Sequence, residues 1–264
     1  MEKIISFLRE AEKDKTYQES FKAVSKEVLE WMSEWMSPAA QKKLQRKKDN
    51  TFEQQKTCRL LLTEHFKKPI GFKDACWIIR SWGGIKSFIG PGSKGGRDKN
   101  KNKNKLENFI AKLDTDELSL TKDEFSTISS LSKVSFFYDF NRYFIYDSRV
   151  IYVLNWILFK TQSEVSLYFP MPSGRNKNIT QYPVEALIKF SFLGKGIKAK
   201  DLDAHYYTGD IAYRKYNELL KALANELYGD QAQAPFLIEM LLFGMADKFV
   251  LNDLERSVNI SLNS

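Results

Sequence analysis

The 264-residue chain is long enough to bury a sizeable hydrophobic core, in one large domain or in two closely packed ones. Its 41 lysines and arginines outnumber its 33 acidic residues, which leaves a net charge of +8 and favours an anionic partner, with nucleic acid the leading candidate. Two cysteines without CxxC spacing and two scattered histidines exclude a disulfide framework and a zinc or iron–sulfur site, so we expect reduced thiols.

The N-terminal stretch predicts neither a secretory signal nor a membrane anchor. MEKIISFLREAEKDK contains acidic residues and lacks the apolar segment of a signal peptide. No apolar run approaches the roughly 18 residues that a membrane span needs. We therefore expect a soluble, cytoplasmic protein that acts as a monomer and has no membrane partner.

The first 89 residues carry apolar side chains at helical spacing. Pro38 marks a helix start, because proline is tolerated in the first turn, and Gly83-Gly84 ends the last helix of this part. The predicted helices cover residues 2–13, 17–36, 41–48, 52–67 and 72–82. We expect them to form an N-terminal helical subdomain, residues 1–89.

Residues 90–105 change the character of the chain. Their sequence, GPGSKGGRDKNKNKNK, has almost no apolar surface and contains six basic residues against one aspartate. Such a segment gains too little from burial to offset its ordering entropy, so a basic flexible loop is predicted. Two interpretations remain open, a solvated insertion or a loop that contacts phosphates.

The remaining residues, 106–264, predict a C-terminal helical subdomain. Helical spacing is found over 106–113, 122–131, 134–140, 150–158, 183–192 and 210–228 and again after Pro235, with a long connection at 161–180. No internal repeat and no sustained strand alternation are present. The predicted fold class is therefore mainly α.

Lys133 and Asp147 each open an apolar segment in this second half. Asp147-Ser148 precedes a buried helix, and such side chains accept the free N–H groups of a first helical turn. Taken alone, Asp147 reads as a helix cap and Lys133 as a solvated surface residue. A lysine half-buried at a helix N-terminus would instead have a lowered pKa and supply a neutral, nucleophilic amine.

Three short motifs carry a resemblance to a known family. Tyr146-Asp147-Ser148-Arg149-Val150 resembles the segment of helix-hairpin-helix DNA glycosylases in which the catalytic aspartate caps a helix. Ser132-Lys133-Val134, Phe144–Val150 and Ile238-Glu239-Met240-Leu241-Leu242-Phe243 resemble bacterial 8-oxoguanine DNA glycosylase-like proteins, some of them linked to phage defence. Two features depart from that pattern. Ser129-Ser130-Leu131-Ser132 has no hairpin glycine, and Asp147 follows Lys133 by 14 residues, a shorter spacing than in the family.

The resemblance implies a multi-helix glycosylase-like fold with a cleft between two helical subdomains. It also implies an enzyme that excises a damaged or modified base from double-stranded DNA, without metal or cofactor and with possible AP-lyase activity. Lys133 would be the Schiff-base nucleophile, and Asp147 would stabilise the cationic sugar of the transition state. By the same resemblance the roles would be DNA repair or antiviral defence, and the target could be a modified base of phage DNA.

Such an enzyme extrudes its target nucleotide and holds the base between aromatic or apolar walls. For that base pocket we select Trp77, Trp82, Tyr138 and Tyr146. The expected DNA-binding residues are Arg149, Arg142, Lys94, Arg97 and Lys99.

A second class of function stays open. The missing hairpin glycines and the short spacing favour a non-catalytic helical protein that binds DNA or another partner on the same scaffold, whereas the lysine and aspartate favour the enzyme. Other chemistries lack their motifs, because the chain contains no P-loop, HExxH or GxSxG sequence.

Overall fold

A computed structural model describes residues 1–66, 70–88, 96–115, 118–161, 167–172, 177–229 and 235–257, with the backbone alone for 96–99 and 177–178. Within these ranges the protein consists of fourteen α-helices joined by short helical turns, and no strand is present. One isolated parallel bridge links Tyr168 and Tyr206. The mainly α fold class is confirmed.

The N-terminal helices begin with α1 (Glu2–Asp14), followed by a 3₁₀ turn, η1 (Thr16–Ser20). Next come α2 (Lys26–Ser33), α3 (Pro38–Gln45), α4 (Thr51–His65), α5 (Phe72–Trp77), the π-helix η2 (Ile78–Trp82) and α6 (Gly96–Lys112).

The second part of the chain begins with α7 (Lys122–Phe125) and α8 (Ile128–Tyr138). The later elements are α9 (Ser148–Lys160), α10 (Lys177–Gln181), α11 (Val184–Gly194), the 3₁₀ turn η3 (Ala199–His205), α12 (Gly209–Tyr228), α13 (Pro235–Met245) and α14 (Phe249–Ser257).

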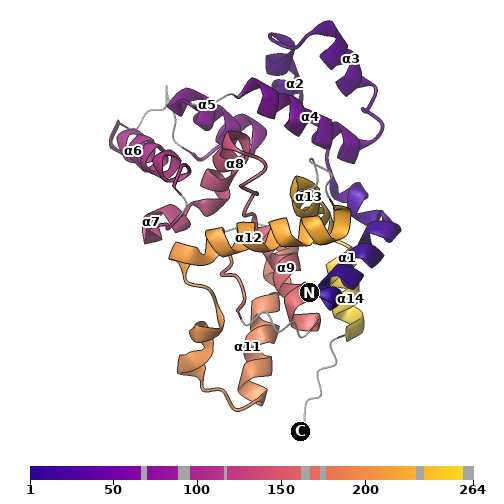
Figure 1. Ribbon diagram of the computed structural model, residues 1–264, viewed down its shortest axis with the longest axis vertical. Coiled ribbons are helices and arrows are strands. Elements are labelled where there is room, and N and C mark those ends of the chain that lie inside the picture. Colours follow the sequence, from indigo (N-terminus) through magenta and orange to yellow (C-terminus); the bar gives the residue numbers. More distant parts are fainter. Residues whose placement is uncertain are drawn as a thin grey trace.

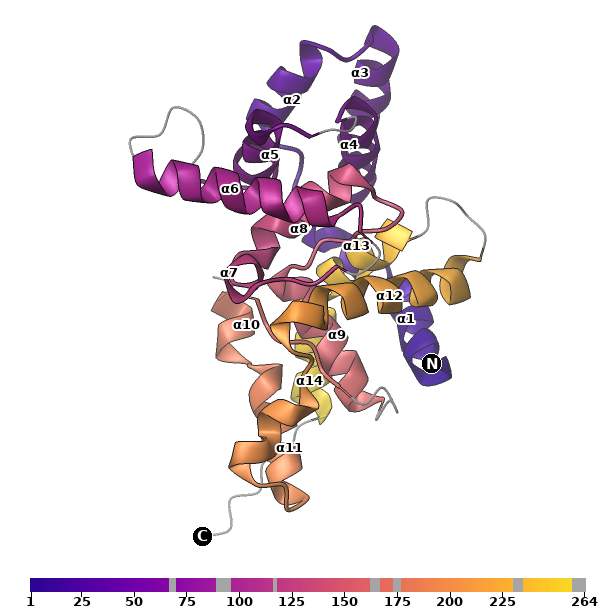
Figure 2. The same cartoon turned by 60° about the vertical axis from the view of Figure 1, so that its left-hand side comes forward.

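The helices form two halves, one above the other in Figure 1. Helices α2 to α6 and α8 make the upper half, and α9, α11 and α14 lie in the lower half, with α12 across the middle (Figures 1 and 2). Helix α1 lies in the lower half and packs against α9 and α12. Helix α1 therefore packs against helices from the second part of the chain as well as against η1.

The predicted helix over 17–36 is interrupted. Phe21 is extended, and α2 begins only at Lys26, where the Ser25 side chain accepts a hydrogen bond from the N–H of Val28 at 3.3 Å. The N–H of Val24 donates to Oε1 of Gln54 at 2.9 Å. This contact with α4 replaces a helical hydrogen bond and holds the chain extended.

The predicted basic loop over 90–105 is helical from Gly96 onward. Leu106 and Phe109 are fully buried on one face of α6, and Leu113 is buried directly after it. Packing of this apolar part stabilises the helix, which then continues through the lysine- and asparagine-rich part. Residues 89–95 lie outside the described part of the chain.

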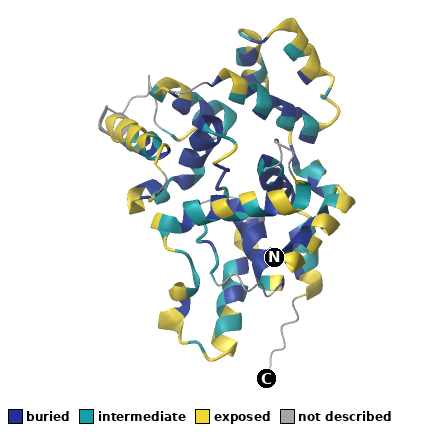
Figure 3. Ribbon diagram, viewed as in Figure 1, coloured by how far each residue is buried: buried dark blue, intermediate teal, exposed yellow. Residues whose placement is uncertain are grey.

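The core is continuous where the halves meet, and Figure 3 shows α8, α9 and α13 buried along much of their length. Tyr213, Phe136 and Phe236 are among the large side chains that are fully enclosed there. Helices α9 and α13 are apolar on nearly every side, as expected for helices that are covered all round.

Candidate active site

A cleft of about 1220 Å³ opens between the two halves. Its walls come from η1 and the extended residues after it, from α4, from the end of η2 and from the starts of α8 and α9, with α13 at its base. Both Lys133 and Asp147 line it, together with Trp82. The predicted lysine and aspartate therefore face the same cavity.

Lys133 is nearly buried, and its Nζ lies 3.8 Å from Oδ2 of Asp147. The same Nζ donates a hydrogen bond to the carbonyl oxygen of Ser129 at 2.6 Å. Gly83 leaves room for this side chain, because a Cβ at Gly83 would lie 2.6 Å from Cδ of Lys133. The last turn of η2 thus packs directly on the lysine stem.

Burial lowers the pKa of Lys133 below its ordinary value, and Arg59 lowers it further, while Asp147 and Glu239 oppose the shift. The expected cause was different. Lys133 was predicted at a helix N-terminus, but α8 begins at Ile128, so the lysine lies in the second turn of the helix. Desolvation, and not the positive end of a helix, favours the neutral amine.

Asp147 uses its two carboxylate oxygens for separate contacts. Oδ1 accepts a hydrogen bond from the backbone N–H of Arg149 at 3.0 Å and so caps α9, as predicted. Oδ2 is turned toward Lys133. Because the side chain keeps 24% of its surface exposed, the carboxylate is reachable from the cleft.

The extended segment before Asp147 is held by α12. Such a buried, non-helical stretch needs partners for its backbone groups. The N–H of Phe144 donates to Oδ1 of Asn217 at 2.9 Å, and the carbonyl of Phe144 accepts from the hydroxyl of Tyr213 at 3.0 Å. The carbonyl of Ile145 accepts from the hydroxyl of Tyr216 at 2.8 Å.

Helix α8 holds the next residue of this segment. The N–H of Tyr146 donates to Oγ of Ser132 at 3.0 Å, and its carbonyl accepts from the hydroxyl of Ser129 at 3.2 Å. Both serines precede Lys133 on α8, Ser132 directly and Ser129 by one helical turn, and Tyr146 directly precedes Asp147. The hydrogen bonds thus fix the distance between the lysine and the aspartate through their immediate neighbours.

A second ion pair lies at the base of the cleft and was not predicted. Nη1 of Arg59 in α4 lies 2.5 Å from Oε2 of Glu239 in α13, and both side chains are buried. The guanidinium lies 5.5 Å from the ring centres of Trp82 and Phe136. Burial raises the pKa of Glu239, and Arg59 opposes the shift. Glu239 is the one charged residue in the apolar sequence of α13, which is the sequence signal that could have indicated a buried partner.

Arg149 also lines the cleft, as its predicted role in DNA binding requires. It forms an ion pair with Asp247, and its guanidinium lies 4.4 Å from the ring centre of Phe243. Burial lowers its pKa, and the charge of Asp147 opposes that shift. The arginine is thus positioned beside Lys133 and Asp147, with its charge already balanced by Asp247.

Of the predicted base-pocket residues, Trp82 lines the cleft and Trp77 does not. Trp82 has one edge-to-face contact with Phe137, with ring centres 4.8 Å apart, and is partly exposed. Trp77 stacks on Trp31 of α2, with ring centres 3.9 Å apart. The ring of Trp77 packs between α5 and α2 and does not reach the cleft.

The two predicted pocket tyrosines also belong to the packed interior. The hydroxyl of Tyr138 donates to Asp114 at 2.5 Å. Tyr146 is fully buried, and its hydroxyl donates to the carbonyl of Pro170 at 2.8 Å. Neither lines the cleft. The prediction placed both tyrosines in the pocket because they are near Lys133 and Asp147 in sequence. Alternation of side chains in the extended segment turns Tyr146 away from the cleft.

The other predicted DNA-binding residues lie away from the cleft or outside the described part of the structure. Arg142 is exposed in the turn after α8, with its guanidinium 5.3 Å from the ring centre of Tyr143. Lys94 lies outside the described residues, and Arg97 and Lys99 belong to the part of α6 whose side chains are outside the described structure.

Within the described ranges, no group of three or more histidine, cysteine, aspartate or glutamate side chains is arranged to hold a metal ion. None of the helices described is both long and apolar enough to cross a membrane. Comparisons with protein-family models, with curated proteins and with solved structures find no match.

Proposed function

We propose that this protein is a DNA glycosylase that removes a damaged or modified base through Lys133 and Asp147. The observation that carries the proposal is the 3.8 Å separation of the two side chains inside a large cleft, with the lysine nearly buried. A perturbed lysine beside a carboxylate in a cleft is the usual setting of a nucleophile with its base.

The geometry fits attack on a sugar carbon. A neutral Nζ would form a bond to C1′ while the glycosidic bond breaks and the base leaves with the bonding electrons. Asp147 would accept a proton from the attacking nitrogen and return it to the departing base. Opening of the sugar ring then gives an imine, from which loss of a C2′ proton expels the 3′ phosphate and nicks the strand.

The cleft offers the surroundings that an extruded nucleotide needs. Its volume of about 1220 Å³ exceeds the range of roughly 300–1,000 Å³ that is common for small-molecule sites. Trp82 supplies an aromatic wall on which a nucleobase can stack. The Arg59–Glu239 pair forms the polar floor of the cleft. We therefore assign base binding to Trp82 and not to the three aromatic residues that pack elsewhere.

The test that does not require the base to be known uses a duplex with an aldehydic abasic site. We expect borohydride to trap a covalent complex with the protein, and Lys133→Gln to abolish it. Asp147→Asn should slow the trapping strongly. In parallel, duplexes carrying oxidised, deaminated, alkylated, hydroxymethylated and glucosylated bases identify the base that is released, including the modified bases of phage DNA.

One observation favours a second candidate. Nζ of Lys133 is already bonded to the Ser129 carbonyl and paired with Asp147, as in an ion pair that only stabilises a fold. A non-catalytic DNA-binding protein would use the cleft without this chemistry. The binding protein would be established, and the glycosylase refuted, by tight and salt-sensitive binding of duplex DNA with no trapping on abasic DNA and no base released from any duplex.

A further inference from the structure

The charges that line the cleft are distributed unevenly. Its charged side chains are Lys22, Arg59, Lys86, Lys133, Asp147, Arg149 and Glu239. In the interior each cation has a carboxylate partner, because Arg59 pairs with Glu239, Lys133 with Asp147, and Arg149 with Asp247. The interior is therefore close to electrically balanced.

Lys22 and Lys86 are the exceptions. Both are exposed at the mouth of the cleft, and neither forms an ion pair with any residue in the described part of the chain. The uncompensated positive charge of the cleft is thus concentrated at its rim. A ligand that enters this cleft meets two free ammonium groups before it reaches the paired charges inside.

The backbone holds each rim lysine in place. The carbonyl of Lys22 accepts a hydrogen bond from Nε2 of Gln55 at 2.8 Å, and the neighbouring Phe21 packs on Phe52, with ring centres 5.2 Å apart. Lys22 is therefore fixed at its Cα, while its ammonium is free to reach a ligand.

Lys86 stands on a turn that follows the π-helix. Gly84 has a φ of 69°, and a Cβ built there would meet no atom within 4 Å, so this turn faces open space. The N–H of Ile85 donates to the carbonyl of Ile79 at 3.0 Å and ties the turn to η2. A glycine turn of this kind lets a ligand approach the backbone closely.

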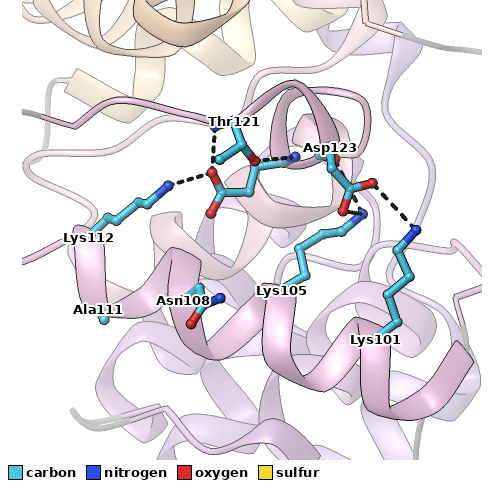
Figure 4. A pocket seen from close by; sticks show the side chains of 8 residues that line it. Lys101, Lys105, Asn108, Ala111, Lys112, Thr121 and Asp123 are labelled. Carbon is cyan, nitrogen blue, oxygen red and sulfur yellow. Dashed lines mark hydrogen bonds and ion pairs between the residues drawn. The ribbon is translucent and has the colours of Figure 1, made fainter. Parts of the chain in front are cut away.

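The basic helix α6 offers a less suitable surface. A smaller pocket, lined by Lys101 and Lys105, continues from the cleft through shared residues such as Ile85 and Ser87. Both lysines point to Asp123 of α7, with Nζ to carboxylate distances of 3.9 and 2.8 Å (Figure 4). Their charges are already compensated, so the rim pair remains the stronger candidate for an anion.

We propose that Lys22 and Lys86 bind two backbone phosphates of duplex DNA on either side of the nucleotide that enters the cleft. The inference rests on the proposed function, which supplies DNA as the ligand. Phosphate contacts fix the position of the duplex without reading its sequence. They would give this chain an anchor that does not depend on hairpin glycines before Lys133.

The experiment measures how the affinity for a duplex depends on salt. The probe carries a tetrahydrofuran abasic analogue, which has no aldehyde and cannot react with Lys133. Each lost phosphate contact reduces the slope of log K against log salt by about 0.9. Lys22→Gln and Lys86→Gln should each reduce it by about that amount, and the double variant by about twice as much.

The matched control is Lys42→Gln with Lys43→Gln, which removes two exposed lysines from α3 outside the cleft lining. This variant should leave the slope unchanged. Equal changes in both double variants, or no change in the rim variant, would overturn the proposal. Circular dichroism of the Lys22, Lys86 and Lys42/Lys43 variants verifies that each remains folded.

Trapping on aldehydic abasic DNA separates this inference from the proposed function. If the salt dependence of binding changes as expected but wild-type protein gives no trapped complex, the phosphate site is supported and the proposed glycosylase activity is refuted. If trapping is efficient but the slope is unchanged in the Lys22 and Lys86 variants, the glycosylase proposal is supported and the two lysines are not its phosphate contacts.

Discussion

Ser132 Oγ accepts the backbone N–H of Tyr146 at 3.0 Å, which joins the residue just before Lys133 to the residue just before Asp147. Ser132 is fully buried, so no water replaces this bond if it is lost. The contact positions the two candidate catalytic side chains without touching a substrate. Its effect should therefore appear in the reaction rate.

Ser132→Ala leaves the N–H of Tyr146 buried without an acceptor, which costs about 1–3 kcal/mol of folding free energy. We expect the rate of covalent trapping at saturating protein to fall, with an unchanged affinity for the tetrahydrofuran duplex. Urea denaturation measures the stability. Ser33→Ala is the control, since its Oγ donates locally to the carbonyl of Glu30 and the residue does not line the cleft. A loss of affinity with an unchanged rate would contradict the positioning role.

The pKa of Lys133 predicts the pH dependence of trapping. Imine formation needs the neutral amine, and burial lowers the lysine pKa from its ordinary 10.5, so the rate should rise with pH and level off below that value. Asp147 raises this pKa. In Asp147→Asn we therefore expect a smaller maximal rate whose midpoint lies at lower pH than in the wild type. A midpoint at higher pH in the variant would refute the electrostatic coupling.

The same shift affects stability. Between the lowered pKa in the folded protein and 10.5 in the unfolded chain, the unfolded chain binds more protons. The contribution of Lys133 to stability should therefore increase with pH across this window. The difference in unfolding free energy between wild type and Lys133→Met, measured as a function of pH, gives this contribution. If the stability of the wild type relative to Lys133→Met decreased as pH rises, the predicted direction would be wrong.

The Arg59–Glu239 pair should be strongly non-additive. Arg59→Met leaves a buried carboxylate without its partner, and Glu239→Leu leaves a buried guanidinium, so each single change should cost about 3–5 kcal/mol. The double variant should cost much less than the sum, because neither charge is left alone. Chemical denaturation of the four proteins gives the coupling energy. Additive losses would show that the two side chains act independently.

Gly83 is required by close packing against the lysine. A Cβ there would lie 2.6 Å from Cδ of Lys133 and 2.8 Å from the carbonyl oxygen of Ile79. Gly83→Ala should therefore destabilise the protein and reduce trapping together, since the lysine stem must move. Gly194→Ala provides the control, because its Cβ would meet nothing within 4 Å. Thermal unfolding should separate the two variants, and equal melting temperatures would argue against the contact.

Helical periodicity and capping signals in the sequence were sufficient to predict several helices. The apolar period predicts α12 and α9, and Asp147 was recognised as the cap of α9, because helix capping depends on residues next to one another in the chain. The same rules misplaced the break at Phe21, where a hydrogen bond from Val24 to Gln54 of α4 competes with helix formation. They also missed the helix through the lysine-rich segment, which depends on Leu106 and Phe109 being buried.

The sequence by itself determined the helical class, the excess positive charge and the presence of a lysine and a capping aspartate in neighbouring segments. Only the tertiary structure decided that Lys133 and Asp147 face one cleft and that Tyr146 is turned away from it. It alone brought Arg59 beside Glu239, 180 residues apart, and left Lys22 and Lys86 without an ion-pair partner among the described residues. The physical reason is that helical periodicity and capping act over a few residues, whereas desolvation and charge pairing depend on which distant helices cover a side chain.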